Sequence, residues 1–178
     1  MRRVVTGHDS TGRAVVVDDG TPPRTHDFAS YPGFRSSLVW ATEPDARACR
    51  VGEDPTGKVE NFLPRPGGSR LIVLTLPPDS TMASPEFDGA AYGAEQLAQS
   101  PGLAETFEVT GMRTTPTVDY TIVLDGEVWL ELDDGELTHL TTGDVVVQNA
   151  TRHGWRNRSD RPVTLAAVLL GAHPDQGA

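Results

Sequence analysis

The chain has 178 residues, and 15 Lys and Arg stand against 25 Asp and Glu, so its formal net charge is −10. An acidic chain of this kind repels phosphate backbones, and we expect no nucleic-acid partner. Its 18 Gly and 14 Pro are typical of a turn-rich folded domain rather than a helical bundle, and a single Cys excludes both an internal disulfide framework and a thiolate zinc site.

The amino-terminal segment has two arginines but no apolar stretch of the length that a signal peptide needs. The longest apolar run, near residues 165–170, is too short to cross a bilayer. We therefore expect a soluble, cytoplasmic protein without a membrane partner.

Residues 1–66 are punctuated by Pro and Gly and contain two strand-like pieces, 14–17 and 34–41. We expect this extension to add strands that pack on the main domain or on a second copy of the chain. The apolar piece 34–41 is the candidate for crossing to a partner in a homodimer, and the alternative is an edge strand within its own chain.

A core strand is predicted over 70–76, and a long connection follows over 77–110. Its short predicted helix, 90–99, has alanines and a leucine on one face and ends at a Pro-Gly pair. Connections of this length inside a compact domain are usually functional, so we expect a lid over a binding site.

The region 118–170 alternates apolar and polar residues in short runs that Gly-bearing turns separate, beginning with the Asp125-Gly126 hairpin turn. The predicted strands are 118–124, 127–132, 137–140, 144–148, 153–157 and 163–170. This pattern predicts an all-β fold, an antiparallel barrel or sandwich.

Four features of this region carry a family resemblance. Gly143-Asp144 leads to His153, and Asn157 follows four residues later, while Asp119 lies seven positions before Gly126. Residues 66–171 thereby resemble the cupin superfamily, and within it a group of small bacterial cupins. The resemblance implies a jelly-roll barrel over residues 67–171, an extension over 1–66 and a flexible tail over 172–178.

Cupins typically hold a divalent metal with two His and an acid from the first signature and one His from the second. In this sequence the resemblance assigns the acid to Asp119 and the last imidazole to His153, but Arg113 and Thr115 occupy the other two positions. An arginine stays protonated and offers only donors. Its charge repels a cation in a barrel of low dielectric constant, so we expect no bound metal and no other cofactor.

Strand alternation indicates which side chains share the barrel interior. Thr121 follows Asp119 on one face, and Trp155 follows His153 on another, where it would form an aromatic wall or ordinary core. The expected substrate-binding set is Arg113, Thr115, Thr121, Gln148 and Trp155, with Arg70 at the mouth.

We expect Asp119 and His153 to be the catalytic acid and base. Burial tends to raise the pKa of Asp119, Arg113 to lower it, and a nearby carboxylate to raise the pKa of His153. With Arg113 as an anion clamp, the hypothesis is a metal-independent isomerase, dehydratase or cyclase acting on a small oxygenated or aromatic, polyketide-like metabolite.

Two alternatives stay open. One is a metal-dependent cupin, a dioxygenase or isomerase, with iron, zinc, nickel or manganese on His153 and Asp119. The other is a non-catalytic cupin that only binds its ligand. We expect Asn157 to cap a turn rather than touch a ligand, and Cys49 to have no catalytic role.

Overall fold

The computed structural model describes residues 1–47 and 54–173, so Cys49 and most of the tail predicted over 172–178 lie outside the described residues. The strands are β1 (Arg3–His8), β2 (Ala14–Gly20), β3 (Arg24–Asp27), β4 (Arg35–Thr42), β5 (Ser69–Leu76), β6 (Thr117–Asp125), β7 (Glu127–Glu131), β8 (Leu137–Thr141), β9 (Val145–Asn149), β10 (Gly154–Arg156) and β11 (Val163–Gly171). The helices are α1 (Gly89–Gln99) and the 3₁₀ turns η1 (Thr56–Lys58), η2 (Asp79–Thr81), η3 (Ala104–Thr106) and η4 (Asp133–Gly135).

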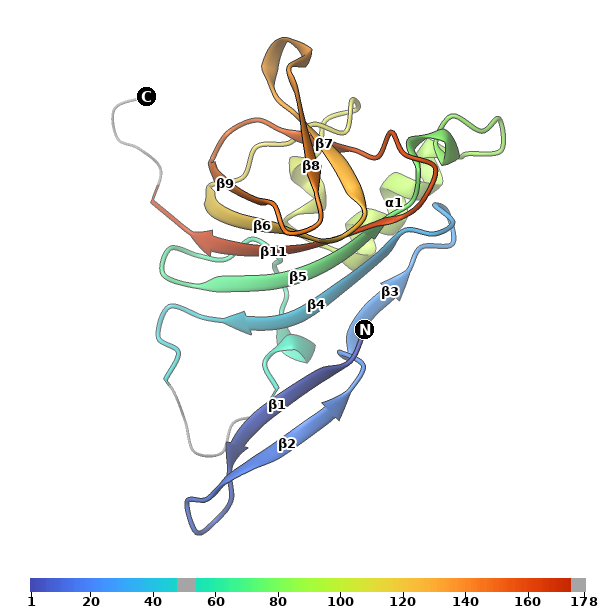
Figure 1. Ribbon diagram of the computed structural model, residues 1–178. Helices are drawn as coiled ribbons and strands as arrows, with labels where there is room; N and C mark the ends of the chain where they lie inside the picture. Colours follow the sequence, from blue (N-terminus) through green and yellow to red (C-terminus); the bar gives the residue numbers. More distant parts are fainter. Residues whose placement is uncertain (48–53, 174–178) are drawn as a thin grey trace.

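Two sheets form the barrel. Six strands pair in the order β3-β4-β5-β11-β6-β9, and three pair in the order β10-β7-β8. The smaller sheet lies over one half of the larger sheet, and the β1–β2 hairpin stands apart from both (Figure 1). Every pairing is antiparallel, which confirms the prediction of an all-β barrel.

The apolar piece predicted over 34–41 forms β4, which pairs with β5 of its own chain in the register Ser37↔Val73. Of the two arrangements expected for this segment, it adopts the strand within its own chain. Two strands, β1 and β3, were not predicted. Strand β3 has four residues, all polar, and their extended form depends on pairing with β4.

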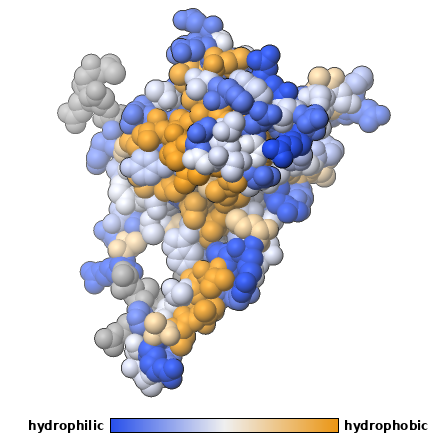
Figure 2. Space-filling view, in the orientation of Figure 1, coloured by the Kyte–Doolittle hydropathy of each residue, from blue (hydrophilic) through white to orange (hydrophobic). Residues whose placement is uncertain are grey.

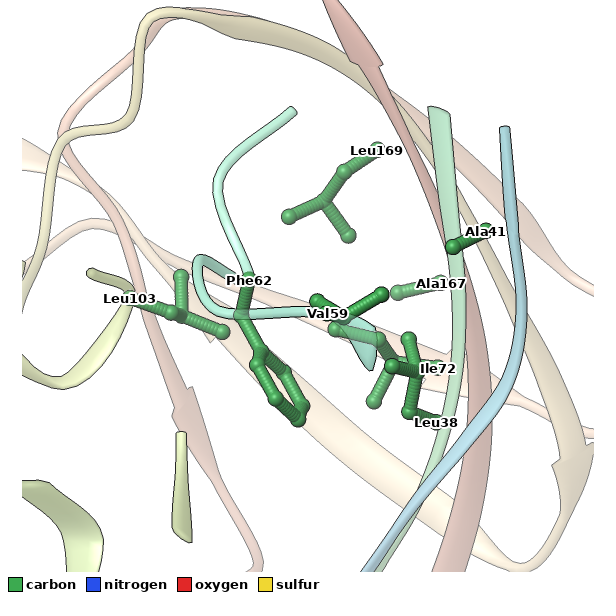
Figure 3. Close-up of a cluster of buried hydrophobic side chains, with 8 residues drawn as sticks. All are labelled: Leu38, Ala41, Val59, Phe62, Ile72, Leu103, Ala167 and Leu169. Carbon is green, nitrogen blue, oxygen red and sulfur yellow. The ribbon is translucent and has the colours of Figure 1, made fainter. Parts of the chain in front are cut away.

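Of the three clusters of buried apolar side chains among the described residues, two hold the barrel together, and the third, Phe28, Tyr31 and Phe34, lies in the extension. The first lies between β4, β5, β11 and the turns beside them (Figure 3), and its members are Leu38, Ala41, Val59, Phe62, Ile72, Leu103, Ala167 and Leu169. The second joins the two sheets, with Val123, Val128, Leu130, Leu140, Val163 and Leu165. Burial of these side chains supplies most of the stabilisation that folding needs.

Strand β6 turns a mostly polar row inward, because its side chains alternate between the two faces of the sheet. Asp119, Thr121 and Val123 are buried, whereas Tyr120 between them is 42% exposed. Gly126 then takes a φ of +89° in the predicted hairpin turn. An added Cβ there would lie 3.1 Å from the carbonyl oxygen of Pro162 and from the Cα of Val163, so the turn requires glycine.

The connection 77–110 crosses the open face of the larger sheet and carries α1. Asp88 caps the amino terminus of the helix, and its side chain accepts hydrogen bonds from Ala90 N–H (2.9 Å) and Ala91 N–H (3.0 Å). Glu95 fastens the helix to the extension, because its carboxylate accepts from Ser30 N–H (2.9 Å) and pairs with His26 (2.7 Å). Within the described residues no helix is both long and apolar enough to span a membrane.

Candidate ligand-binding site

A cavity of about 120 Å³ lies between the connection 77–110, the inner face of the larger sheet and β10. A cavity of roughly 150 Å³ binds benzene in another protein, so this space has the size of one ring. Its walls are mostly apolar and aromatic, from Phe34, Ile72, Leu74, Leu76, Pro77, Met82, Leu103, Phe107, Trp155, Ala167 and Leu169. Its polar lining comes from Tyr31, Ser36, Asp79, Tyr92, Gln96, Ser100, Gly111, Arg113, Arg156 and Asn157.

Two arginines line the cavity, and Arg156 is paired with Glu131, which leaves Arg113 as the cation available to a ligand. Its guanidinium carbon lies 4.9 Å from the centre of the Phe107 ring, and its Nε is enclosed with no hydrogen-bond partner. In the part of the chain that the structure describes, no carboxylate forms an ion pair with it. Burial lowers the pKa of Arg113, and the charges of Asp119 and Tyr92 only partly offset this. The side chain is thus a partly desolvated cation, which an anion bound beside it would stabilise.

His153 lies beside Arg113 in the barrel and is 1% exposed. Its Nδ1 lies 2.9 Å from the carbonyl oxygen of Thr151, so this nitrogen donates and Nε2 is left as an acceptor. Nε2 is buried and has no partner. Burial, together with the charge of Arg113, lowers the pKa of His153 to about 4. The expectation of a raised pKa is therefore wrong, because burial and a neighbouring cation dominate.

Asp119 is 4% exposed and faces Gln148 directly across the β6–β9 pair. Its Oδ1 and both polar side-chain atoms of Gln148 are enclosed without a hydrogen-bond partner. Burial raises the pKa of Asp119 and outweighs the lowering by Thr117 and Arg113. Neither Asp119 nor His153 lines the cavity. They form a polar interior that adjoins Arg113.

The other expected pocket residues divide into two groups. Trp155 lines the cavity and meets the His153 ring edge-on at 6.0 Å, and it also packs against the second apolar cluster. Thr115 and Thr121 are buried on the barrel side and do not line the cavity. The hydroxyl of Thr115 accepts a hydrogen bond from Thr117 at 2.8 Å.

Arg70 was expected at the mouth of the pocket, and the structure places it elsewhere. Its guanidinium pairs with Glu43 at 2.7 Å and donates to the carbonyl of Asn61 at 3.2 Å. Arg70 occupies the first inward position of β5, where loops close the end of the barrel. Its side chain therefore closes the end of the barrel, and the cavity lining on this strand begins two residues further along, at Ile72.

Several cavity residues were not found from the sequence. Tyr31 lies in an irregular part of the extension, while Asp79, Tyr92 and Gln96 lie in the connection 77–110. No motif marks any of them. The one available signal was the length of the connection, which indicated a lid but not which of its side chains face inward.

A family model described as a Cupin domain matches residues 108–169. Phomopsin biosynthesis cluster protein C′ of Diaporthe leptostromiformis is 56% identical to this chain over 185 residues, which cover 95% of this chain and 84% of that protein. The chain belongs to the cupin superfamily. A "cupin-domain-containing oxidoreductase virC" of Hypocrea virens is 38% identical over 69 residues, 37% of this chain and 36% of that protein. A cupin superfamily structure from Desulfitobacterium hafniense DCB-2 has a TM-score of 0.41 at 10% identity and covers 78% of this cupin and 77% of that chain.

The relatives named from curated proteins are fungal, and the narrower resemblance to small bacterial cupins stays an expectation.

The metal that many cupins hold does not fit the residues of this cupin. The interior offers two strong ligands, Nε2 of His153 and Oδ1 of Asp119, and an amide from Gln148. Among residues 1–47 and 54–173, no three His, Cys, Asp or Glu side chains cluster as a metal site. The positive charge of Arg113 also reaches both strong ligands, since it lowers the pKa of each. A divalent cation there would meet the same repulsion.

Proposed function

We propose that this cupin is an enzyme of secondary metabolism that binds a small anionic metabolite, aromatic or oxygenated, and converts it by proton transfer. An isomerase, dehydratase or cyclase reaction fits this chemistry and needs no metal. The name of the phomopsin-cluster relative supports the biosynthetic setting. The observation that carries the proposal is the unpaired cation of Arg113 on the wall of an aromatic cavity.

An unpaired guanidinium in such a place is costly unless a ligand supplies the missing negative charge. Carboxylates, enolates and phenolates supply it with matching geometry, because a guanidinium donates two parallel hydrogen bonds to such groups. The aromatic walls, including Trp155 and Phe107, favour a flat or unsaturated body for the same ligand. An anion developing during reaction would be stabilised by the same group.

His153 and Asp119 are the proposed proton carriers. His153 is neutral near pH 7 and keeps Nε2 as an acceptor. Because Nε2 is enclosed behind the cavity, its role as a general base requires a ligand group or one water molecule to reach it past Arg113. The raised pKa of Asp119 favours a carboxyl that can return a proton. Both groups feel the charge of Arg113, so a ligand anion on Arg113 lies within electrostatic reach of both.

The test of the anion clamp compares one acidic and one neutral probe of the same shape. We expect wild type to bind 4-methylbenzoate more tightly than 4-methylbenzamide in isothermal titration calorimetry. Arg113→Gln should weaken 4-methylbenzoate about tenfold or more and leave the amide unchanged. The matched control is Arg152→Gln, because Arg152 is half-exposed and pairs with Glu108 and Asp133 instead of lining the cavity. Equal weakening of both probes by Arg113→Gln contradicts the clamp.

Two observations favour a second candidate, a metal-dependent oxidoreductase. One relative is named as a cupin-domain-containing oxidoreductase, and His153 keeps its Nε2 free in the interior. Elemental analysis of protein purified without chelator separates the candidates. Near-stoichiometric iron, zinc, nickel or manganese that is lost in His153→Asn supports the oxidoreductase and rejects the metal-independent enzyme.

A non-catalytic cupin is separated from both enzymes by turnover. Intermediates of the neighbouring biosynthetic steps are incubated with wild type and with His153→Asn. Tight binding without product in either protein favours a binding function.

We also propose a homodimer with the β1–β2 hairpin at its interface. Val4, Val16 and Val17 of the hairpin are 48%, 57% and 50% exposed, and hydrophobic residues form a strip along it (Figure 2, orange). A two-stranded hairpin gains little stability unless another surface covers it. Light scattering after size exclusion should give twice the chain mass, and Val16→Lys should shift it to one chain mass.

A further inference from the structure

The cavity has a second polar group that the anion clamp does not use. Asp79 and Tyr31 both line the cavity. Asp79 is the first residue of η2, three residues after the end of β5, and Tyr31 comes from the extension before β4. Burial is the main cause that raises the pKa of the Tyr31 phenol, and the charges of Tyr92 and Asp79 add to it. The two side chains therefore form one polar patch built from distant parts of the chain.

Each of these side chains has hydrogen-bonding capacity to spare. Oδ1 of Asp79 accepts from the backbone N–H of Asn157 at 3.0 Å, while its second oxygen has no partner in the part of the chain that the structure describes. Tyr31 is 3% exposed, and its hydroxyl likewise has no hydrogen bond there. Tyr31 is packed in place by Phe34, Phe87 and Tyr92, so its hydroxyl is held in a fixed position.

Together the pair offers an acceptor and a donor at one place. A carboxylate oxygen accepts, and a phenol hydroxyl donates. A hydroxyl group on a ligand needs both, because it donates one hydrogen bond and accepts others. Burial is the largest cause of the raised pKa of Asp79, although the charges of Arg156 and Arg158 lower it. The net rise indicates that unpaired negative charge, and with it a second anionic group of the ligand, is unfavourable there.

We infer that the ligand of this cupin is a hydroxylated monoanion, with its anionic group on Arg113 and its hydroxyl between Asp79 and Tyr31. This inference rests on the proposed function, because Arg113 supplies the first contact. The apolar walls between the two polar places accept a body of about one ring, in keeping with a volume of about 120 Å³.

The experiment uses three para-substituted benzoates of nearly equal shape: 4-methylbenzoate, 4-(hydroxymethyl)benzoate and 4-(aminomethyl)benzoate. We expect wild type to bind the hydroxymethyl probe about tenfold more tightly than the methyl probe in titration calorimetry. In Asp79→Asn and Tyr31→Phe the difference should disappear, while the affinity for 4-methylbenzoate stays the same. Asp79→Asn keeps an oxygen for the Asn157 N–H, and Asp160→Asn is the matched control on an exposed loop.

The outcomes separate this inference from the anion clamp. If the carboxylates bind through Arg113 but without preference for the hydroxymethyl probe, the inference is overturned and the clamp survives. If wild type prefers the aminomethyl probe and Asp79→Asn loses this preference, the inference of a ligand hydroxyl is overturned. The group that the ligand places at Asp79 is then an ammonium. If no benzoate binds more tightly than 4-methylbenzamide, the clamp itself is wrong, and the inference fails with it. Thermal melting of each variant shows whether a lost affinity reflects lost folding.

Discussion

Arg113 and His153 are joined by two backbone hydrogen bonds, N–H to O=C in both directions, at 2.8 and 2.9 Å. This isolated bridge links the segment that follows the connection 77–110 to the residue before β10. It holds the guanidinium beside the imidazole, although forty residues separate them in the sequence. The cation that lines the cavity is therefore electrostatically coupled to the imidazole behind it.

The first prediction tests this coupling. Arg113→Met removes the positive charge and keeps a long apolar side chain, so the pKa of His153 should rise from about 4. It should stay below 6.5, because burial is the larger cause of the shift. Imidazole ¹⁵N and ¹H chemical shifts followed against pH measure it. An unchanged pKa in Arg113→Met would mean that the charge of Arg113 does not reach the ring.

The second prediction concerns stability in mild acid. The pKa of His153 is about 4 in the folded protein against 6.5 for an ordinary histidine, so the unfolded chain binds a proton in a range where the folded chain does not. The free energy of unfolding should therefore fall by about 3 kcal/mol between pH 6.5 and pH 4. Urea unfolding across this range measures the slope.

The control for that slope is His153→Asn, whose amide can still donate to the Thr151 carbonyl but does not titrate. Between pH 6.5 and pH 4, the free energy of unfolding of His153→Asn should fall by about 3 kcal/mol less than that of wild type. The raised pKa of Asp119 acts in the opposite direction and is present in both proteins, so it cancels in the difference. A slope that is equal in both proteins contradicts the lowered pKa of His153.

The third prediction concerns the attachment of α1 over the cavity. The Glu95 carboxylate accepts from Ala29 N–H at 3.1 Å and from Ser30, and it pairs with His26. These contacts lower the pKa of Glu95 to about 2, so the carboxylate is charged at all ordinary pH values. Glu95→Ala leaves the N–H groups of Ala29 and Ser30 without an acceptor and should destabilise the helix by about 1–3 kcal/mol.

Amide hydrogen exchange checks this prediction. Glu95→Ala should accelerate exchange more in α1 than in β5 or β11, each compared with wild type. Glu86→Ala is the control, because Glu86 is exposed next to the same helix. If Glu95→Ala accelerates exchange equally in helix and sheet, the contact stabilises the whole fold rather than the cover of the cavity.

Much of the fold could be predicted because it depends on local pattern. The alternation along 118–124 and the Asp125-Gly126 turn predict β6 and β7 nearly to the residue, and the helix predicted over 90–99 is α1. The same alternation places Asp119 and Thr121 inside. Strand β3 escaped prediction because four polar residues carry no pattern, and only the pairing with β4 makes them a strand.

The candidate site was predictable only in part, because a cavity depends on which distant segments meet. Arg113 and Trp155 belong to a recognisable motif region and do line the cavity. Tyr31 and Asp79 reach it through packing that no sequence spacing reveals. Arg70 shows the converse: its position on β5 was predicted, but its partner Glu43 lies on a loop whose path the sequence does not indicate.

The last prediction concerns the buried Asn157, which is 1% exposed. Its amide nitrogen donates to the carbonyls of Leu76 at 3.0 Å and Arg161 at 2.8 Å, and its oxygen accepts from Ser159. This confirms the expected turn cap and also ties β10 to the end of β5. Asn157→Ala should lower the free energy of unfolding by about 3 kcal/mol, because it leaves buried carbonyls without donors.

Urea unfolding measures this loss, and Asn149→Ala is the matched control, since Asn149 is exposed at the end of β9. Asn157→Asp should be at least as harmful as the alanine variant, because a carboxylate oxygen would then face the two carbonyls that now accept hydrogen bonds. A loss below about 1 kcal/mol in both variants would show that water replaces the amide, and that the junction of β5 and β10 does not depend on this side chain.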